Sequence, residues 1–177
     1  KVMQTDSEHE WWASRASLLV TDPSGNHIDL PSNVRAYMIA GTPHFAEPGS
    51  VLGHAKTMAL PVNPMHAGQS MRALLQSLNE WITSEIEPPT SRVPMRSHGT
   101  LVPATEAVPR NLPTLPYDAL YTSAYLSDHA QLPPKVLGRY EVLVPLADSD
   151  GMSVAGIRSL PLAVPKASYT AWNPRAV

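Results

Sequence analysis

The stretch VRAYMIAGTPH, residues 34–44, decides the fold class of this chain. Residues 34–40 are rich in β-branched, aromatic and aliphatic side chains, and Arg35 alone interrupts the apolar run. That pattern is typical of a strand buried on both faces of a parallel sheet. Gly41 and His44 follow it directly, at the strand end where α/β folds place their chemistry. The stretch therefore predicts an α/β fold with His44 as a candidate site residue.

The first half of the chain predicts an alternation of strands and helices around this stretch. Residues 1–5 are expected to be the end of a strand, and Asp6-Ser7-Glu8 a loop that caps a helix over 10–20. The segment 68–84 predicts the clearest helix, because its apolar residues recur with a 3.6-residue period: Met71, Leu74, Leu75, Leu78, Trp81 and Ile82. Two strands are too few for a buried parallel sheet, so we expect residues outside this chain to complete it.

The second half is rich in proline, which accounts for 19 residues of the chain and falls mostly between 88 and 165. Proline lacks the amide donor and fixes φ, which disfavours long helices and central strands. Residues 88–177 are therefore predicted to be an extended segment with short strands that packs on the core of residues 1–87 within one domain. Short strands are expected at 139–145 and 155–157, joined through the turn Asp148-Ser149-Asp150-Gly151.

Composition excludes several classes of function. The net charge is -2 without a cluster of basic residues, which disfavours nucleic-acid binding. No apolar run reaches the roughly 18 residues of a membrane span, so the sequence predicts a soluble chain, either secreted or periplasmic or cytoplasmic. The absence of cysteine excludes disulfides, thiolate catalysis and cysteine-ligated zinc. Because the chain opens on Lys1 without a signal pattern, we expect it to begin inside a longer or processed polypeptide.

The candidate chemistry is a carboxylate that precedes a histidine by about one helix and one strand. Asp6, Glu8 and Glu10 lie in the loop or helix start after the first predicted strand, and His44 follows the second. Nucleophilic hydrolysis needs an imidazole to accept the serine proton and a carboxylate to orient that imidazole. In α/β hydrolases the chain order is serine, acid, histidine. The order of acid and histidine here fits the second and third members.

The chain resembles the C-terminal region of a family of carboxylesterase-like proteins labelled alpha/beta hydrolase domain. Trp11 stands where the family usually has tyrosine, and Ala171 where it more often has glycine. The resemblance covers nearly the whole chain, and its motifs occur in the family's order: Lys1-Val2, Thr5-Asp6-Ser7, Glu10-Trp11-Trp12, Ser17-Leu18-Leu19, Asp22-Pro23-Ser24-Gly25, Val34-Arg35-Ala36-Tyr37, Ala40-Gly41-Thr42-Pro43-His44, Asn63-Pro64, Arg72-Ala73-Leu74-Leu75, Trp81, Pro88-Pro89-Thr90-Ser91-Arg92, Gly99-Thr100-Leu101-Val102-Pro103, Val144-Pro145, Asp148-Ser149-Asp150-Gly151, Ala155-Gly156-Ile157-Arg158 and Tyr169-Thr170-Ala171-Trp172-Asn173.

This resemblance implies the C-terminal portion of an α/β-hydrolase fold, with His44 as the triad base and Glu10 as the triad acid. Asp6 is the alternative acid. The nucleophilic serine and the oxyanion-hole amides are expected in an N-terminal half outside this chain. The implied partners are that half and a small-molecule ester, with no cofactor required. Trp11 and Trp12, beside Glu10, are candidates for lining a substrate pocket.

Other motifs give weaker evidence of a function. Ser70 lies in Gly68-Gln69-Ser70-Met71-Arg72, which lacks the last glycine of a nucleophile elbow and opens a helix. The acidic turn at 148–151 lacks the later ligands of a calcium loop, and His54 and His66 lack the helical spacing of a zinc site.

The sequence thus favours a serine hydrolase that acts on carboxylic esters. Two alternatives stay open: a non-catalytic module used in binding or structure, and an amidase, lactonase or acyltransferase with the same triad.

Overall fold

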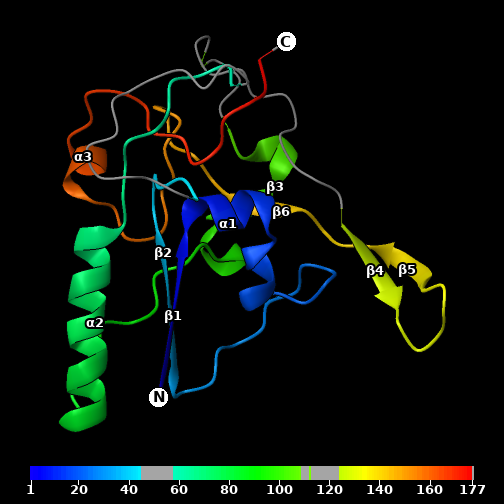
Figure 1. Cartoon of the computed structure of the whole chain (residues 1–177), viewed down its shortest axis with the longest axis horizontal. Helices are drawn as coiled ribbons and strands as arrows, with labels where there is room; N and C mark the ends of the chain where they lie inside the picture. The colour runs from blue at the N-terminus through cyan, green and yellow to red at the C-terminus, as the bar shows by residue number, and fades with distance from the viewer. Residues whose placement is uncertain (45–57, 109–111, 113–123, 177) are drawn as a thin grey trace.

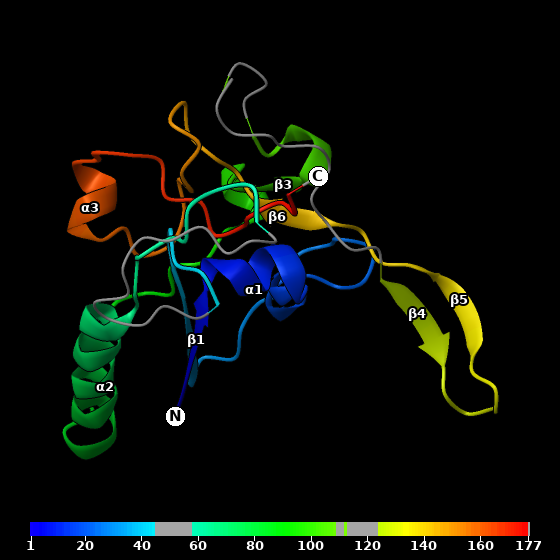
Figure 2. The ribbon, with the colours of Figure 1, turned by 45° about the horizontal axis from the view of Figure 1, so that its top comes forward.

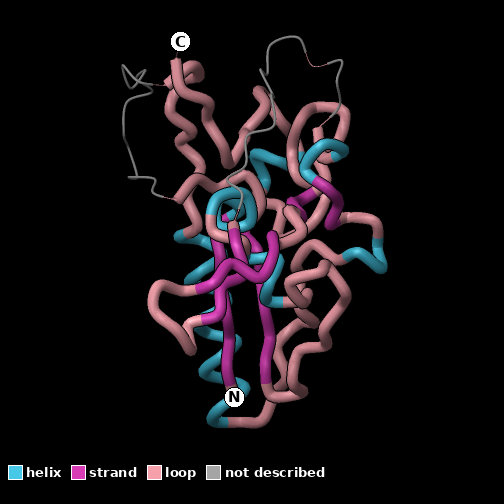
Figure 3. Tube along the Cα trace, turned by 90° about the vertical axis from the view of Figure 1, so that its right-hand side faces the viewer, coloured by secondary structure: helices cyan, strands magenta, loops and turns pink. Residues whose placement is uncertain are grey.

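Two parallel strands form the centre of the molecule. The computed structural model describes residues 1–44, 58–108, 112 and 124–176. Strand β1 (Val2–Ser7) pairs with β2 (Val34–Ile39) in a register that runs from Val2 opposite Val34 to Ser7 opposite Ile39 (Figures 1 and 3). Because the strands are parallel, both carboxyl ends lie at one edge of the sheet. The segments that leave β1 and β2 are therefore neighbours.

Strand β2 has neighbours on both sides. Ile39 pairs with Ser7 of β1 and also bridges Ile157, while Tyr37 bridges Arg92. Residues 36–40 are buried, as expected of a strand covered on both faces. Among the described strands β1 pairs with β2 alone, so its other edge has no strand beside it in this part of the chain.

The helix predicted over 10–20 is two shorter elements. Helix α1 (Glu8–Ala13) is followed by a 3-10 helix (Ala16–Leu19), and between them Arg15 adopts the left-handed region with φ 62°. The Arg15 guanidinium donates to the Trp12 carbonyl at 3.1 Å, which satisfies an acceptor exposed by the end of α1. Continuous helical periodicity was therefore the wrong interpretation of this segment.

Helix α2 (Gly68–Thr83) confirms the helix predicted over 68–84. Its predicted apolar face is only half covered, however: Leu74 and Trp81 are buried, whereas Met71, Leu75 and Ile82 are exposed, Leu75 to 67%. Helix α2 packs against β1, which covers only part of this face. Lys1 donates to the Trp81 carbonyl at 3.0 Å, and its ammonium and the Arg35 guanidinium lie over the indole ring.

The second half contains short elements, as its proline content predicts. Strand β3 (Leu101–Pro103) pairs antiparallel with β6 (Leu143–Pro145), and β4 (Tyr125–Asp128) pairs with β5 (Lys135–Arg139). Three single-turn helices accompany them: 3-10 turns at Arg96–His98 and Ala104–Glu106, and α3 (Leu160–Ala163). Figure 2 shows the β4–β5 hairpin projecting from the body.

The predicted strands at 139–145 and 155–157 are only partly correct. Strand β5 ends at Arg139 in the exposed hairpin and β6 begins at Leu143 in the core, because the chain passes between two sheets there. Segment 155–157 makes one isolated bridge, from Ile157 to β2. The turn at 148–151 is present and is closed by a bridge from Ala147 to Ser153.

The buried side chains form two apolar clusters, and both draw on the two halves of the chain. One joins Trp11 and Met38 to Leu143 and Leu162, and the other joins Trp12 to Trp172 and Val144. Residues 1–87 and 88–177 therefore share their cores, although the exact boundary between them stays a prediction. None of the helices in the described ranges is long and apolar enough to cross a membrane.

Gly41 provides a test of how tightly the end of β2 is held. Its φ is +70°, and an added Cβ would lie 2.8 Å from Cδ1 of the buried Leu162. Gly41→Ala should therefore combine backbone strain of about 1–2 kcal/mol with a comparable cost of overpacking. Urea unfolding measures the loss.

Gly99→Ala is the matched control, because Gly99 has a φ of +65° and no atom within 4 Å of the added Cβ. It should lose the backbone cost alone. Equal losses in the two variants would contradict close packing at Gly41. Gly41→Ala should also cost less stability when it is made in a Leu162→Ala background than in wild type, because the truncated side chain leaves room for the new methyl group.

Candidate active site

His44 and Glu10 meet where the two central strands end. Glu10 lies in the first turn of α1, directly after β1, and His44 follows β2. The Nδ1 atom of His44 lies 2.5 Å from Oε1 of Glu10. The imidazole is about half exposed and the carboxylate is mostly covered. The structure thus brings together the base and the first-choice acid that the sequence predicts.

The environment of Glu10 favours its ionised form. Burial raises the pKa of this carboxyl, but hydrogen bonds from the Ser7 hydroxyl and from His44 outweigh it, so the pKa lies below its ordinary value of 4.5. Ser7 is the N-cap residue of α1, and its hydroxyl donates to the Glu10 carboxylate three residues ahead. An ionised carboxylate only accepts hydrogen bonds, so Nδ1 of His44 carries the proton in this contact.

Asp6 lies at the same edge of the sheet, but its hydrogen-bond partner and the direction of its pKa shift differ from those of Glu10. It accepts a hydrogen bond from the Gln4 side chain at 2.7 Å. Burial and the nearby negative charge of Glu10 raise the pKa of Asp6, against the lowering effect of Gln4. The pKa values of the two carboxyls are therefore shifted in opposite directions, that of Asp6 upward from 3.8 and that of Glu10 downward from 4.5.

The turn that leads from β2 to His44 is held by hydrogen bonds at Gly41 and Thr42. The Gly41 amide donates to the Glu8 carboxylate at 2.7 Å, and the Gly41 carbonyl accepts from Asn63 at 2.8 Å. The Thr42 hydroxyl donates to the Ile39 carbonyl at 2.5 Å, and the Thr42 carbonyl accepts from the His9 amide at 3.3 Å. These hydrogen bonds fix the backbone that leads to His44.

A cavity of about 390 Å³ opens beside the pair. Polar side chains from β1, α1 and the His44 turn share its wall with apolar residues from β2 and the start of α2: Thr5, Asp6, Ser7, Glu10, His44, Ile39, Ala67 and Met71. Ser7 is the serine in this lining, and its hydroxyl is donated to Glu10.

His9 is a further imidazole at the site that the sequence did not single out. Its ring centroid lies 5.6 Å from that of His44, and its Nδ1 lies 2.9 Å from the Ala171 carbonyl. A carbonyl can only accept, so Nδ1 of His9 is the donor. The contact joins α1 to the C-terminal segment. The two residues lie far apart in the sequence, so no local sequence pattern predicts it.

The remaining predicted residues lie elsewhere. Trp11 and Trp12 are buried in the two apolar clusters and do not line the cavity, so their role in substrate binding stays a prediction. Ser70 lies in the first turn of α2 and is not part of the lining. The exposed His66 accepts from the Gly68 amide, whereas His54 falls outside the described residues.

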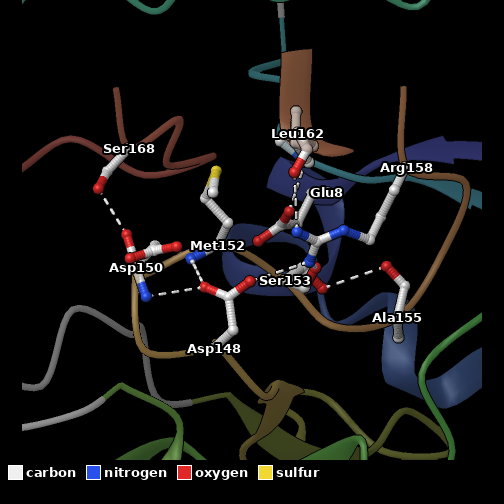
Figure 4. A network of polar contacts seen from close by, with 10 residues as sticks. Glu8, Asp148, Asp150, Met152, Ser153, Ala155, Arg158, Leu162 and Ser168 are labelled. Carbon is white, nitrogen blue, oxygen red and sulfur yellow. Dashed lines mark hydrogen bonds and ion pairs between the residues drawn. The ribbon is translucent and has the colours of Figure 1, made fainter. Parts of the chain in front are cut away.

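The acidic turn at 148–151 is satisfied by protein groups. Asp148 accepts from the amides of Asp150 and Met152 with one oxygen and from Arg158 with the other (Figure 4). The described part of the chain holds no group of three potential metal ligands. Protein groups therefore pair with both oxygens of the Asp148 carboxylate.

Comparison with known proteins identifies a family. A family model described as "Alpha/beta hydrolase domain" matches residues 1–177. No curated protein and no solved structure matches the chain significantly. The match spans the whole sequence, and the parallel strands with an acid and a histidine at their ends agree with it. This chain therefore belongs to the alpha/beta hydrolase domain family, whose members are of hydrolase type.

Proposed function

We propose that this chain supplies the histidine and the acid of a serine hydrolase that acts on carboxylic esters. The observation that carries the proposal is the 2.5 Å contact between His44 and Glu10 at the carboxyl ends of adjacent parallel strands. A half-exposed imidazole oriented by a mostly covered carboxylate, beside an open cavity, is the arrangement that nucleophilic catalysis requires.

The proposed chemistry follows from the protonation states. Glu10 holds the proton of His44 on Nδ1, so Nε2 has the free electron pair and accepts the serine proton as the oxygen attacks the ester carbonyl. The resulting imidazolium is stabilised by Glu10 and returns the proton to the departing alcohol. Water then enters by the same route and hydrolyses the acyl-enzyme. This reaction needs no cofactor.

Glu10 is the better acid in this scheme than Asp6. The carboxylate must stay ionised while it orients the imidazole, and the pKa of Glu10 is lowered whereas that of Asp6 is raised. The Asp6 carboxylate also accepts a hydrogen bond from the Gln4 side chain.

The nucleophilic serine is assigned to a segment outside these residues, the N-terminal half of the hydrolase. The serine in the cavity lining, Ser7, donates its hydroxyl hydrogen to the Glu10 carboxylate. Two surfaces would receive the missing half: the edge of β1, which pairs with β2 alone among the described strands, and the apolar stripe of α2 formed by Met71, Leu75 and Ile82. Exposed apolar surface beside an open sheet edge is expected where a domain core continues.

Substitution of the pair tests the proposed chemistry. In the complete protein, His44→Ala should lower kcat for a short-chain chromogenic ester by about 10⁶-fold and Glu10→Gln by about 10⁴-fold, since the triad acts as a unit. His98→Ala, at an exposed histidine in a 3-10 turn, is the matched control and should retain activity.

The same assay separates the alternatives. A wild-type protein that turns over neither esters, amides nor lactones would favour a non-catalytic module. Preference for an amide, a lactone or an alcohol acceptor would assign the triad to an amidase, lactonase or acyltransferase. A fluorophosphonate probe should label a serine outside this chain, and labelling of Ser70 would overturn the assignment.

The opposite pKa shifts predict opposite pH dependences of stability. The pKa of Glu10 is lowered in the folded state, so Glu10 stabilises the protein at pH values above its ordinary pKa of 4.5. This contribution to the unfolding free energy is lost as the pH falls through the folded pKa. The difference in unfolding free energy between wild type and Glu10→Gln should therefore shrink as the pH is lowered. Urea unfolding at a series of pH values from about 2 to about 7 measures it, because the ordinary pKa values of carboxyls lie near 4.

Asp6→Asn is the internal comparison. The pKa of Asp6 is raised, so its contribution is present at low pH and is lost as pH rises through the folded pKa. The difference between wild type and Asp6→Asn should therefore grow as the pH is lowered. Parallel trends in the two variants would contradict the assignment of Glu10 as the ionised partner of His44.

The apolar stripe of α2 tests the proposed packing of the serine-bearing half. Leu75→Asp places a charge in the centre of the stripe and should lower the unfolding temperature of the complete protein, because a carboxylate there must be desolvated. Asn79→Asp adds the same charge at another exposed position of the same helix. If both variants unfold at one temperature, α2 faces solvent and receives no further segment there.

A further inference from the structure

We propose that Glu8 is a positioning residue, a buried carboxylate that clamps the His44 turn to the helix carrying Glu10. This inference rests on the proposed function, because it concerns the alignment of the same pair. The side chain of Glu8 is not part of the cavity lining, and the residue is only 4% exposed. Glu8 therefore acts on the site through the backbone rather than on the substrate.

The clamp has contacts at two levels. The Glu8 carboxylate accepts from the Gly41 amide at 2.7 Å, and the Glu8 amide donates to the Thr42 hydroxyl at 3.3 Å. Glu10 lies two residues further along the same helical turn and contacts His44. One turn of α1 thus holds both the backbone that leads to His44 and the ring of His44 itself.

A carboxylate is needed at this position because both of its oxygens face N–H donors. Oε2 accepts from Gly41, and Oε1 accepts from the Trp12 indole at 3.1 Å. A glutamine has the same shape, but one of its two groups is an NH₂ donor. Whichever way that amide turns, its NH₂ group meets either the Gly41 amide or the Trp12 indole. The conflict must displace the turn or the helix.

A positive charge beside Glu8 makes its burial tolerable. Figure 4 shows the Glu8 carboxylate next to the Arg158 guanidinium. Burial is the largest effect and leaves the pKa of Glu8 above its ordinary value of 4.5, with a further rise from the charge of Asp148, although the hydrogen bonds from Gly41 and Trp12 and the charge of Arg158 lower it. Arg158 is itself held by the Asp148 carboxylate at 3.1 Å and the Leu162 carbonyl at 3.0 Å. The 148–162 segment thereby carries the countercharge for the clamp.

The consequence for catalysis is geometric. Proton transfer through His44 requires its ring to be aligned with both Glu10 and the nucleophile, and a displacement of about 1 Å can cost 10²-fold in rate. Substrate binding depends on the cavity, which Glu8 does not line. Loss of the clamp should therefore lower kcat while KM changes little.

The test is a double-mutant cycle in the complete protein. Glu8→Gln should lower ester kcat by about ten- to a hundred-fold with little change in KM. Trp12→Phe removes the indole donor, so in the Glu8→Gln background the amide oxygen can face Gly41 without a conflict. The double variant should then recover much of the kcat lost in Glu8→Gln relative to Trp12→Phe alone. Absence of this recovery would overturn the proposal.

Leu101→Ala separates positioning from general destabilisation. Leu101 is a buried residue of β3 that makes none of the clamp's hydrogen bonds described above, and its truncation should lower the unfolding temperature at unchanged kcat. If kcat and unfolding temperature fall together in the same proportion in Leu101→Ala and Glu8→Gln, Glu8 is merely structural.

Hydrogen exchange of the Gly41 amide gives a readout that does not depend on turnover. It should be slow in wild type, faster in Glu8→Gln, and slow again in the double variant. If the three proteins show this pattern of exchange but the wild type hydrolyses no ester, the proposed function is wrong and the role of Glu8 in holding the turn is supported. If Gly41 exchanges equally in wild type and Glu8→Gln, the clamp is refuted whatever the activity.

Discussion

The parallel pairing of β1 with β2 places Ser7 opposite Ile39, and this register determines where everything at the site lies. Parallel strands present their carboxyl ends at one edge, so helix α1 and the turn at Gly41 begin side by side. Glu10 and His44 can meet only because each lies a few residues beyond these ends. A shift of one residue in the register would reverse the faces of β1 and separate the pair.

Charge is distributed around this edge according to its access to water. Glu10 is partly accessible and is held ionised by Ser7 and His44, whereas Glu8 is buried and depends on two N–H donors and on nearby Arg158. A buried carboxylate without such partners would be strongly unfavourable. The proline-rich second half thus contributes more than a cover, because the 148–162 segment brings the compensating cation to the first helix.

The sequence predicted the local elements best where one physical signal dominated. The strand at 34–40 and the helix at 68–84 followed from hydrophobic pattern alone. The segment 10–20 did not, because Arg15 enters the left-handed region and its side chain caps the Trp12 carbonyl, a tertiary arrangement that overrides helical periodicity. The apolar stripe of α2 was read correctly as a pattern, but which of its residues are buried depends on what packs against the helix.

The sequence by itself determined the α/β character, the family resemblance and the candidate pair of Glu10 and His44, because these depend on residue types in a fixed order. Only the tertiary structure showed that Glu10 contacts His44, and that burial and hydrogen-bond partners give Asp6, Glu8 and Glu10 different environments. It likewise brought His9 to Ala171 and placed Arg158 near Glu8, residues that lie far apart along the chain. Such contacts depend on the path of the folded backbone, which local patterns do not encode.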